Sequence, residues 1–155
     1  MFTMSTLRNT PVIVNQKSVG ILQNVCLDMV QKKVCALHVS CGLHGRYLIM
    51  PEDVLTISQE FILAANLNRY KHCNKQTSVP FVRDTTGMLV GFVTDYAISK
   101  STLELAAVEM RTGLLPREYL TRIWIMNFTY QIQRNELVVP ASLGCELIYS
   151  AGGNA

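Results

Sequence analysis

The sequence has little charge and no long apolar run. Only 16% of its 155 residues are charged, whereas 49% are hydrophobic; an average globular protein is about 25% charged. This balance excludes a disordered chain, because there is enough apolar surface to form a core. The longest stretches without Lys, Arg, Asp or Glu, such as 34–45 and 123–133, are shorter than the roughly 18 residues of a membrane-spanning helix. The composition predicts a soluble, core-rich protein.

The first residues do not have the pattern of an export signal, and the number of cysteines is odd. The N-terminal residues show no basic segment followed by an apolar run, and the five cysteines stand at positions 26, 35, 41, 73 and 145. A disulfide framework is therefore not expected, and we predict reduced thiols and a cytoplasmic location. The formal net charge of +3 is too small to require a polyanionic partner.

Motifs for catalysis are missing as well. The sequence contains no G-x-S-x-G elbow, no phosphate-binding glycine loop, no dinucleotide fingerprint and no H-E-x-x-H motif. Glu52 and Asp53 are neighbours, and adjacent side chains on an extended chain diverge, which argues against a carboxylate pair for acid–base chemistry. We expect no enzymatic activity and no cofactor.

An internal repeat is present. Residues 19–27 (VGILQNVCL) have a counterpart 71 positions later at 90–98 (VGFVTDYAI), and 34–39 match 105–110 at the same offset. A second match aligns 47–54 with 136–143 at an offset of 89, which would give the second copy 18 extra residues. The pattern predicts two copies of one unit.

Each copy has the pattern of β structure: short runs of Val, Ile, Leu and aromatic residues between turn residues. The predicted strands are 11–15, 19–28, 33–40, 46–51, 60–64, 79–83, 88–98, 103–110, 125–133 and 136–140. A polar, acid-free segment over 66–78 predicts a linker. Pro116 and apolar spacing over 116–124 predict one short helix, inserted at about 114–124 of the second copy.

Two turns and one alternating strand are also predicted. Asp84–Gly87 and Arg134–Asn135 carry turn residues. Between 125 and 133, apolar and polar residues alternate, which predicts Met126, Phe128, Tyr130 and Ile132 on a buried face.

These motifs resemble the PRC-barrel family. The resemblance rests on Val19-Gly20…Asn24-Val25 with Leu48–Val54, and on Val90-Gly91…Asp95-Tyr96 with Val138–Leu143. It implies an all-β protein of two tandem small antiparallel β-barrels, over 10–65 and 79–149, joined by the 66–78 linker. Members of this family that are understood dock onto proteins or ribonucleoproteins and catalyse nothing. The resemblance therefore implies a non-enzymatic adaptor in a bacterial cytoplasm, with a protein partner.

The small size of each unit favours packing of the two units together or a homodimer, because a barrel of roughly 70 residues buries only about 60% of its unfolded surface. For the docking hypothesis we predict Arg117, Tyr119 and Arg122 as partner-binding residues. The Tyr, Trp and Met residues are first interpreted as barrel core; the alternative is that Tyr119 and Trp124, on the inserted helix, anchor a partner.

Two other hypotheses follow from the residues. RNA or ribonucleoprotein binding would use the basic stretch that contains Arg69, Tyr70, Lys71 and Lys75, since basic and aromatic side chains can contact phosphates and stack on bases. A small metal- or ligand-binding protein would use Cys35, His38, Cys41 and His44, which are ligand types of zinc. Strand alternation places Cys35 and His38 on opposite faces, so no metal site is predicted.

Overall fold

The computed structural model describes residues 1–70, 79–112, 122–126 and 130–142. These residues form an all-β structure, as predicted, with the helix α1 (Met4–Leu7) and two single 3₁₀ turns, Gly42–His44 and Pro51–Asp53. Thr3 caps α1, because its Oγ1 accepts a hydrogen bond from the Thr6 amide at 3.2 Å. None of the helices in the described residues is long and apolar enough to cross a membrane.

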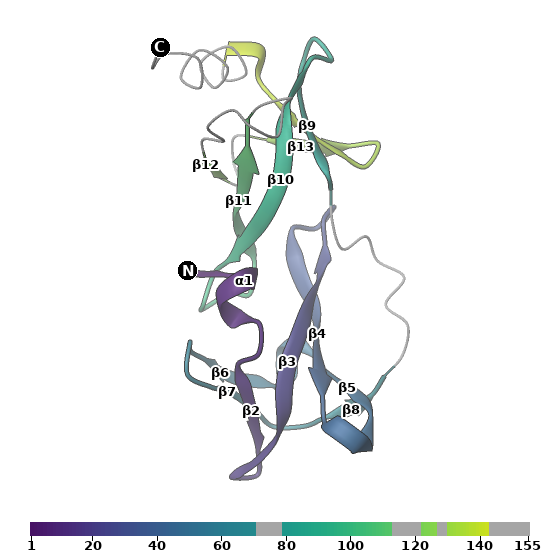
Figure 1. Cartoon of the computed structure of the whole chain (residues 1–155), viewed down its shortest axis with the longest axis vertical. Coiled ribbons are helices and arrows are strands. Elements are labelled where there is room, and N and C mark those ends of the chain that lie inside the picture. The colour runs from purple at the N-terminus through teal and green to yellow at the C-terminus, as the bar shows by residue number, and fades with distance from the viewer. Residues whose placement is uncertain (71–78, 113–121, 127–129, 143–155) are drawn as a thin grey trace. The chain divides into compact units, whose positions relative to one another are not determined.

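The first sheet has the strand order β6-β7-β2-β3-β4-β5-β8. Its strands are β2 (Pro11–Val14), β3 (Lys17–Asp28), β4 (Lys33–Ser40), β5 (Arg46–Ile49), β6 (Val54–Ile57), β7 (Ile62–Ala64) and β8 (Asn68–Arg69). The long hairpin of β3 and β4 is its centre (Figure 1). Strands β2 and β7 pair in parallel, and the other neighbours pair antiparallel.

The second sheet repeats this order as β13-β14-β9-β10-β11-β12. Its strands are β9 (Phe81–Asp84), β10 (Leu89–Ile98), β11 (Leu105–Arg111), β12 (Arg122–Met126), β13 (Gln131–Gln133) and β14 (Glu136–Val139). The strand β1 (Phe2–Thr3) lies at the N-terminus. Again one pair is parallel, here β9 with β14. The predicted internal repeat is therefore confirmed for the central hairpins.

The glycine of each V-G motif has the same role in both sheets. A Cβ on Gly20 would lie 2.2 Å from the Ser40 carbonyl oxygen, and one on Gly91 would lie 2.3 Å from that of Arg111. Ser40 and Arg111 are themselves equivalent positions of the internal repeat. Only glycine allows the two backbones of each hairpin to come this close.

The polar residue four positions after each of these glycines also has the same role in both sheets. The side chain of Asn24 accepts a hydrogen bond from the Val25 amide at 3.0 Å, and Asp95 accepts one from the Tyr96 amide at 2.8 Å. In the first sheet the register shifts between Leu22 and Asn24, as at a β-bulge. The polar side chain satisfies an amide where the ladder is interrupted.

The predicted alignment of 47–54 with 136–143 is wrong. Strand β5 pairs antiparallel with β4, whereas β14 pairs in parallel with β9. The counterpart of β14 is therefore β7, which pairs in parallel with β2, and the counterpart of β5 is β12. Similar apolar residues before a proline suggested the alignment, but strand pairing decides it. The extra length of the second copy lies between β11 and β12, where residues 112–121 correspond to 41–45.

Several predicted elements differ from the structure. Residues 122–124 of the predicted helix are strand, because they pair with 109–111 of β11. The rest of the predicted helix, 114–121, lies outside the described residues.

The predicted strand 125–133 is two strands, β12 and β13, and Met126 is exposed while Ile125 is buried. Tyr130 is buried as predicted; Phe128 lies outside the described residues. Strands β1 and β6 and helix α1 were not predicted, and β8 lies within the predicted linker.

Both predicted turns are confirmed. Arg134 and Asn135 have φ values of 47° and 68° and join β13 to β14, as in a type I′ hairpin. Asp84 Oδ1 accepts hydrogen bonds from the Thr86 and Met88 amides, both at 2.9 Å, and closes the turn between β9 and β10.

The chain divides into two compact units. Unit 1 comprises Met1–Thr77 and Ile98–Leu105, and unit 2 comprises Ser78–Ala97 and Ala106–Ala155. The tip of the β10–β11 hairpin thus belongs to unit 1, where Val34 N donates to Leu103 O at 2.9 Å and Leu105 N donates to Lys32 O at 2.8 Å. Lys33 pairs there with Glu104, its own counterpart in the repeat. The barrel boundaries 10–65 and 79–149 stay a prediction.

Candidate docking surface on the second sheet

An aromatic pair lies on the solvent-facing side of the second sheet. Phe81 of β9 and Phe92 of β10 are cross-strand partners, and their ring centroids are 5.7 Å apart. Along β9, Phe81 and Arg83 point to one face, whereas Val82 and Asp84 are buried on the other. This alternation leaves Phe81 38% and Phe92 37% exposed, so the sheet presents an apolar patch to solvent rather than to its core.

The same face continues onto β11 and β12. Glu109 is the cross-strand partner of Trp124, and Thr94 of β10 donates to the Glu109 carboxylate at 3.1 Å. Arg122 Nε lies 3.6 Å from Glu109 Oε1. Trp124, the only tryptophan of the chain, is 40% exposed.

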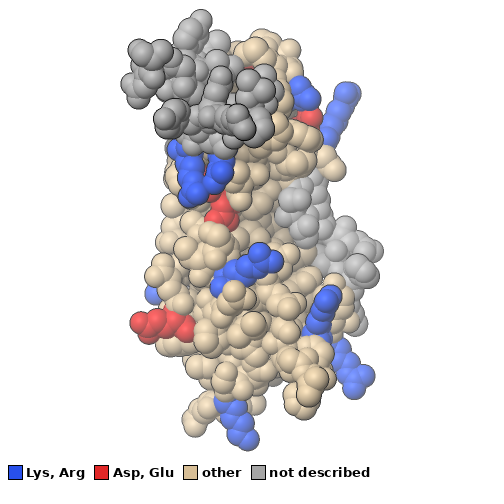
Figure 2. Space-filling view, in the orientation of Figure 1, with Lys and Arg blue, Asp and Glu red and all other residues tan. Residues whose placement is uncertain are grey.

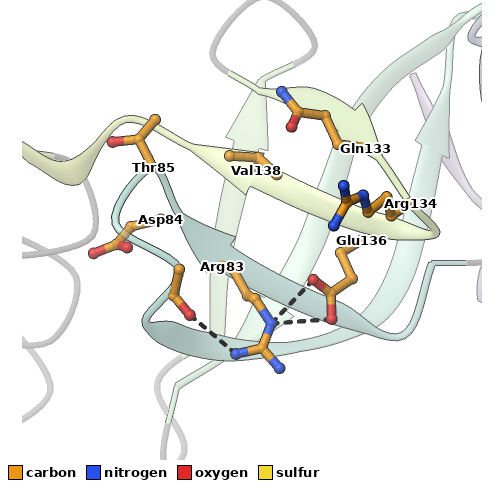
Figure 3. A pocket seen from close by; sticks show the side chains of 8 residues that line it. Arg83, Asp84, Thr85, Gln133, Arg134, Glu136 and Val138 are labelled. Atoms are coloured by element: carbon orange, nitrogen blue, oxygen red, sulfur yellow. Dashed lines mark hydrogen bonds and ion pairs between the residues drawn. The ribbon is translucent and has the colours of Figure 1, made fainter.

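At the other end of this face lies a pocket of about 340 Å³. It is lined by Arg83, Asp84, Thr85, Gly87, Gln133, Arg134, Glu136 and Val138. Figure 3 shows the Arg83 guanidinium pointing at the Glu136 carboxylate, with Nε at 3.0 Å from both oxygens, and Nη1 donating to the Gly87 carbonyl at 3.0 Å. The ion pair joins β9 to β14 across their parallel pairing.

Asp84 lines this pocket, but its side chain stabilises the turn between β9 and β10. Besides two amides, its Oδ1 accepts a hydrogen bond from Thr86 Oγ1 at 2.6 Å. This hydroxyl hydrogen bond, together with the backbone ones, lowers the pKa of Asp84 below its usual value. Its carboxylate is thus held ionised by its own turn.

The described face combines aromatic rings with two arginines, Arg83 and Arg122, that each pair with a glutamate. The carboxylates are engaged: Glu136 by Arg83, Glu109 by Arg122 and Thr94, and Asp84 by its turn. Exposed aromatic side chains beside Arg are enriched in protein-binding hot spots.

The aromatic face is defined here by Phe81, Phe92, Trp124 and Met126, of which Met126 is 41% exposed. Arg122, a predicted partner-binding residue, adjoins it. Trp124 was first interpreted as core and is instead 40% exposed. Arg117 and Tyr119 lie outside the described residues. The phenylalanines, Arg83 and Glu136 were not predicted as site residues. The phenylalanines could have been identified as site residues by their position. Phe81 and Phe92 lie on the outward face of their strands, where polar residues are usual.

The residues of the nucleic-acid hypothesis lie on unit 1. Arg69 is exposed in β8, and Tyr70 packs edge-on against His38, with ring centroids 5.3 Å apart. Lys71 and Lys75 lie outside the described residues. On the face shown in Figure 2, the described Lys and Arg side chains lie singly or in small groups with wide uncharged surface between them.

The Cys and His residues near the β4 strand have separate surroundings. Cys35 Sγ contacts the Cys26 carbonyl at 3.2 Å, and His38 packs against Tyr70. Burial and the charge of Arg46 lower the pKa of His38, and burial raises the pKa of the Cys41 thiol. Within the described part of the chain, no three His, Cys, Asp or Glu side chains form a group that could hold a metal ion.

Comparison of the chain with models of known protein families and with curated proteins finds no match.

Proposed function

We propose that the chain is a non-enzymatic docking protein built from two PRC-barrel-type units, and that it binds a protein partner through the aromatic face of unit 2. The observation that carries this proposal is the exposure of Phe81, Phe92 and Trp124 on one sheet face beside two ion-paired arginines. The matching strand order of the two sheets supports the tandem architecture that the family resemblance implies.

Exposure of these rings to water is unfavourable in the free protein. Complete burial of a large side chain contributes about 1.5–3 kcal/mol. Phe81, Phe92 and Trp124 are 37–40% exposed, so covering the exposed part of each ring would contribute a fraction of that free energy. A partner that covers them recovers it. The Arg83–Glu136 and Arg122–Glu109 pairs at the two ends would select the orientation of the partner through charge complementarity.

The test is co-purification of the tagged full-length chain from its own host, with and without nuclease, in three forms. Wild type should retain one stoichiometric protein in both samples. The double variant Phe92→Ser, Trp124→Ala should lose it. Leu43→Ser is the matched control, because Leu43 is a fully exposed apolar residue of unit 1, and it should retain the partner.

Two outcomes would contradict the proposal. Loss of the captured material on nuclease treatment would favour the nucleic-acid hypothesis of Arg69, Tyr70, Lys71 and Lys75. Equal capture by wild type and by the Phe92 and Trp124 variant would show that the aromatic face does not dock the partner.

A further inference from the structure

The turns at the ends of the two central hairpins contact each other within unit 1. The first tip comprises residues 28–34, between β3 and β4, and the second tip comprises residues 99–105, between β10 and β11. The two tips are equivalent at the repeat offset of 71. Lys32 and Leu103 are equivalent positions with φ values of 55° and 54°, so both tips contain the same left-handed residue.

The hydrogen bonds between the tips have two-fold symmetry. Val34 N donates to Leu103 O at 2.9 Å, and Leu105 N donates to Lys32 O at 2.8 Å. The two donors are equivalent positions of the repeat, and so are the two acceptors. The second hydrogen bond therefore repeats the first with the copies exchanged, which is the pattern of an isologous interface.

Lys33 and Glu104 lie at the centre of this contact. They are equivalent positions as well, and they face each other in an antiparallel bridge. The two hydrogen bonds flank the bridge, as in a non-hydrogen-bonded pair, where facing side chains come closest. Lys33 Nζ lies 3.4 Å from Glu104 Oε1, and the two side chains are 58% and 47% exposed. The position at which each tip meets its own equivalent thus carries opposite charges in the two copies.

These charges decide which tips can pair. If two first tips from different chains met, Lys33 would face another Lys33, and two second tips would bring Glu104 against Glu104. Like charges directly opposite each other destabilise an antiparallel pair, whereas opposite charges stabilise it. The charges therefore favour a first tip with a second tip, although an interface between equivalent segments would otherwise accept like tips too.

Asp28 is a further charged group beside Lys33. It is the Cα partner of Lys33 across the β3–β4 hairpin, and its Oδ1 accepts hydrogen bonds from the Val30 and Gln31 amides at 3.1 and 3.0 Å. Because Asp28 belongs to the same tip as Lys33, its effect is the same whichever tip lies opposite. The choice between tips therefore depends on Lys33 and Glu104.

We infer that the tips form a self-complementary docking surface whose further partner is the unlike tip of a second copy of this chain, and that Lys33 and Glu104 are its specificity determinants. Two chains that exchange residues 98–105 would each complete unit 1 of the other and keep every contact between the tips. This inference is independent of the proposed docking function, because the aromatic face consists of other residues.

The experiment mixes two full-length variants, Lys33→Glu and Glu104→Lys. In the first variant alone the facing groups are two carboxylates, and in the second alone they are two ammonium groups. In the mixture, each tip finds an oppositely charged partner only on the other variant. After the two variants are unfolded together in urea and refolded, native mass spectrometry should detect a dimer with one chain of each. Its amount should be roughly tenfold above the dimer of either variant alone, because it replaces like-charged pairs with opposite ones.

Three controls connect this dimer to the charges. A mixture of Lys17→Glu and Glu60→Lys has the same net charges, but both residues are exposed in unit 1 outside the tips, and it should give no more dimer than wild type. Salt at about 1 M should reduce the dimer of the tip variants to the level of either one alone, because the Debye length is then about 3 Å. The double variant Lys33→Glu with Glu104→Lys should melt at a higher temperature than Lys33→Glu alone, since Asp28 has the same effect in both.

Three results would overturn the inference. As much dimer in either tip variant alone as in their mixture would show that like tips are not excluded. No more dimer in the mixture than in the Lys17 and Glu60 control would show that the tips do not pair between chains. A double variant that melts no higher than Lys33→Glu alone would show that the two charges do not interact. Partner capture through Phe92 and Trp124 is measured separately, so the proposed function does not depend on these results.

Discussion

Gly20 and Gly91 lie where the two central hairpins bring their backbones together. We predict that Gly20→Ala and Gly91→Ala each lower the free energy of unfolding by about 1–3 kcal/mol. A Cβ at either site would lie within 2.3 Å of a carbonyl oxygen, and a backbone atom cannot move aside cheaply. Urea denaturation measures the change.

Gly42→Ala is the comparison for this prediction. No atom lies within 4 Å of a Cβ at Gly42, whose φ is 61°, so only the left-handed conformation opposes the change, at about 1 kcal/mol. A loss at Gly20 and Gly91 no greater than at Gly42 would contradict the close approach.

His38 should make stability depend on pH. Its folded pKa is lowered by burial and by Arg46, below the usual value of about 6.5. Between these two values the unfolded chain binds more protons than the folded one, so stability is complete above about pH 6.5 and falls as the pH drops towards the folded pKa. We therefore predict that the melting temperature declines as the pH is lowered below about 6.5.

His38→Phe should flatten the decline, because phenylalanine keeps the ring contact with Tyr70 without a titrating group. His44→Asn, in the exposed turn Gly42–His44, should leave it as in wild type. A decline that persists in His38→Phe would assign it to other groups.

At the scale of elements, the β13–β14 hairpin offers a direct test of the turn. Arg134 and Asn135 both adopt positive φ, which costs non-glycine residues about 1–2 kcal/mol each. We predict that Arg134→Asn with Asn135→Gly raises the free energy of unfolding by about 1 kcal/mol, because Asn-Gly is the preferred pair of a type I′ turn. Urea denaturation measures this change as well.

The turn between β2 and β3 in the first sheet provides a second test by urea denaturation. Asn15 and Gln16 join β2 to β3 with φ values of 50° and 63°, and Gln16→Gly there should also stabilise. Loss of stability in both variants would contradict the type I′ assignment.

Element prediction from sequence succeeded where the signal was local. Strand β4 has the predicted bounds of 33–40, and β10 begins at Leu89, next to the predicted start, and ends at Ile98 as predicted. Prediction failed at 122–124, where apolar spacing fits a helix as well as a strand. Pairing with β11 decides in favour of strand there, and places Ile125 rather than Met126 in the core.

At the scale of the whole chain, unit 1 is not a continuous segment. Residues 98–105 complete it, and Leu105 is fully buried. We predict that a fragment spanning 1–77 does not fold cooperatively, because it lacks Leu105 and the backbone hydrogen bonds at Val34 and Lys32. Circular dichroism and amide hydrogen exchange of the purified fragment measure this.

The matched control is co-expression of fragments 1–77 and 78–155, which together contain every residue of unit 1 and should form a folded complex. A sharp thermal transition of the 1–77 fragment alone would contradict the prediction and show that the segment from Ile98 to Leu105 is not required.

The sequence by itself determined the strands of the central hairpins, the turns, the V-G positions and the existence of a repeat, because these depend on neighbouring residues and on a regular spacing. Only the tertiary structure decided which strands are equivalent, since the parallel pairs β2–β7 and β9–β14 join segments that are distant in the sequence. The candidate site depends on the same long-range pairing. Arg122 and Trp124 could be selected by type, but their place on β12 beside Glu109 follows from the partner that each strand finds across the sheet.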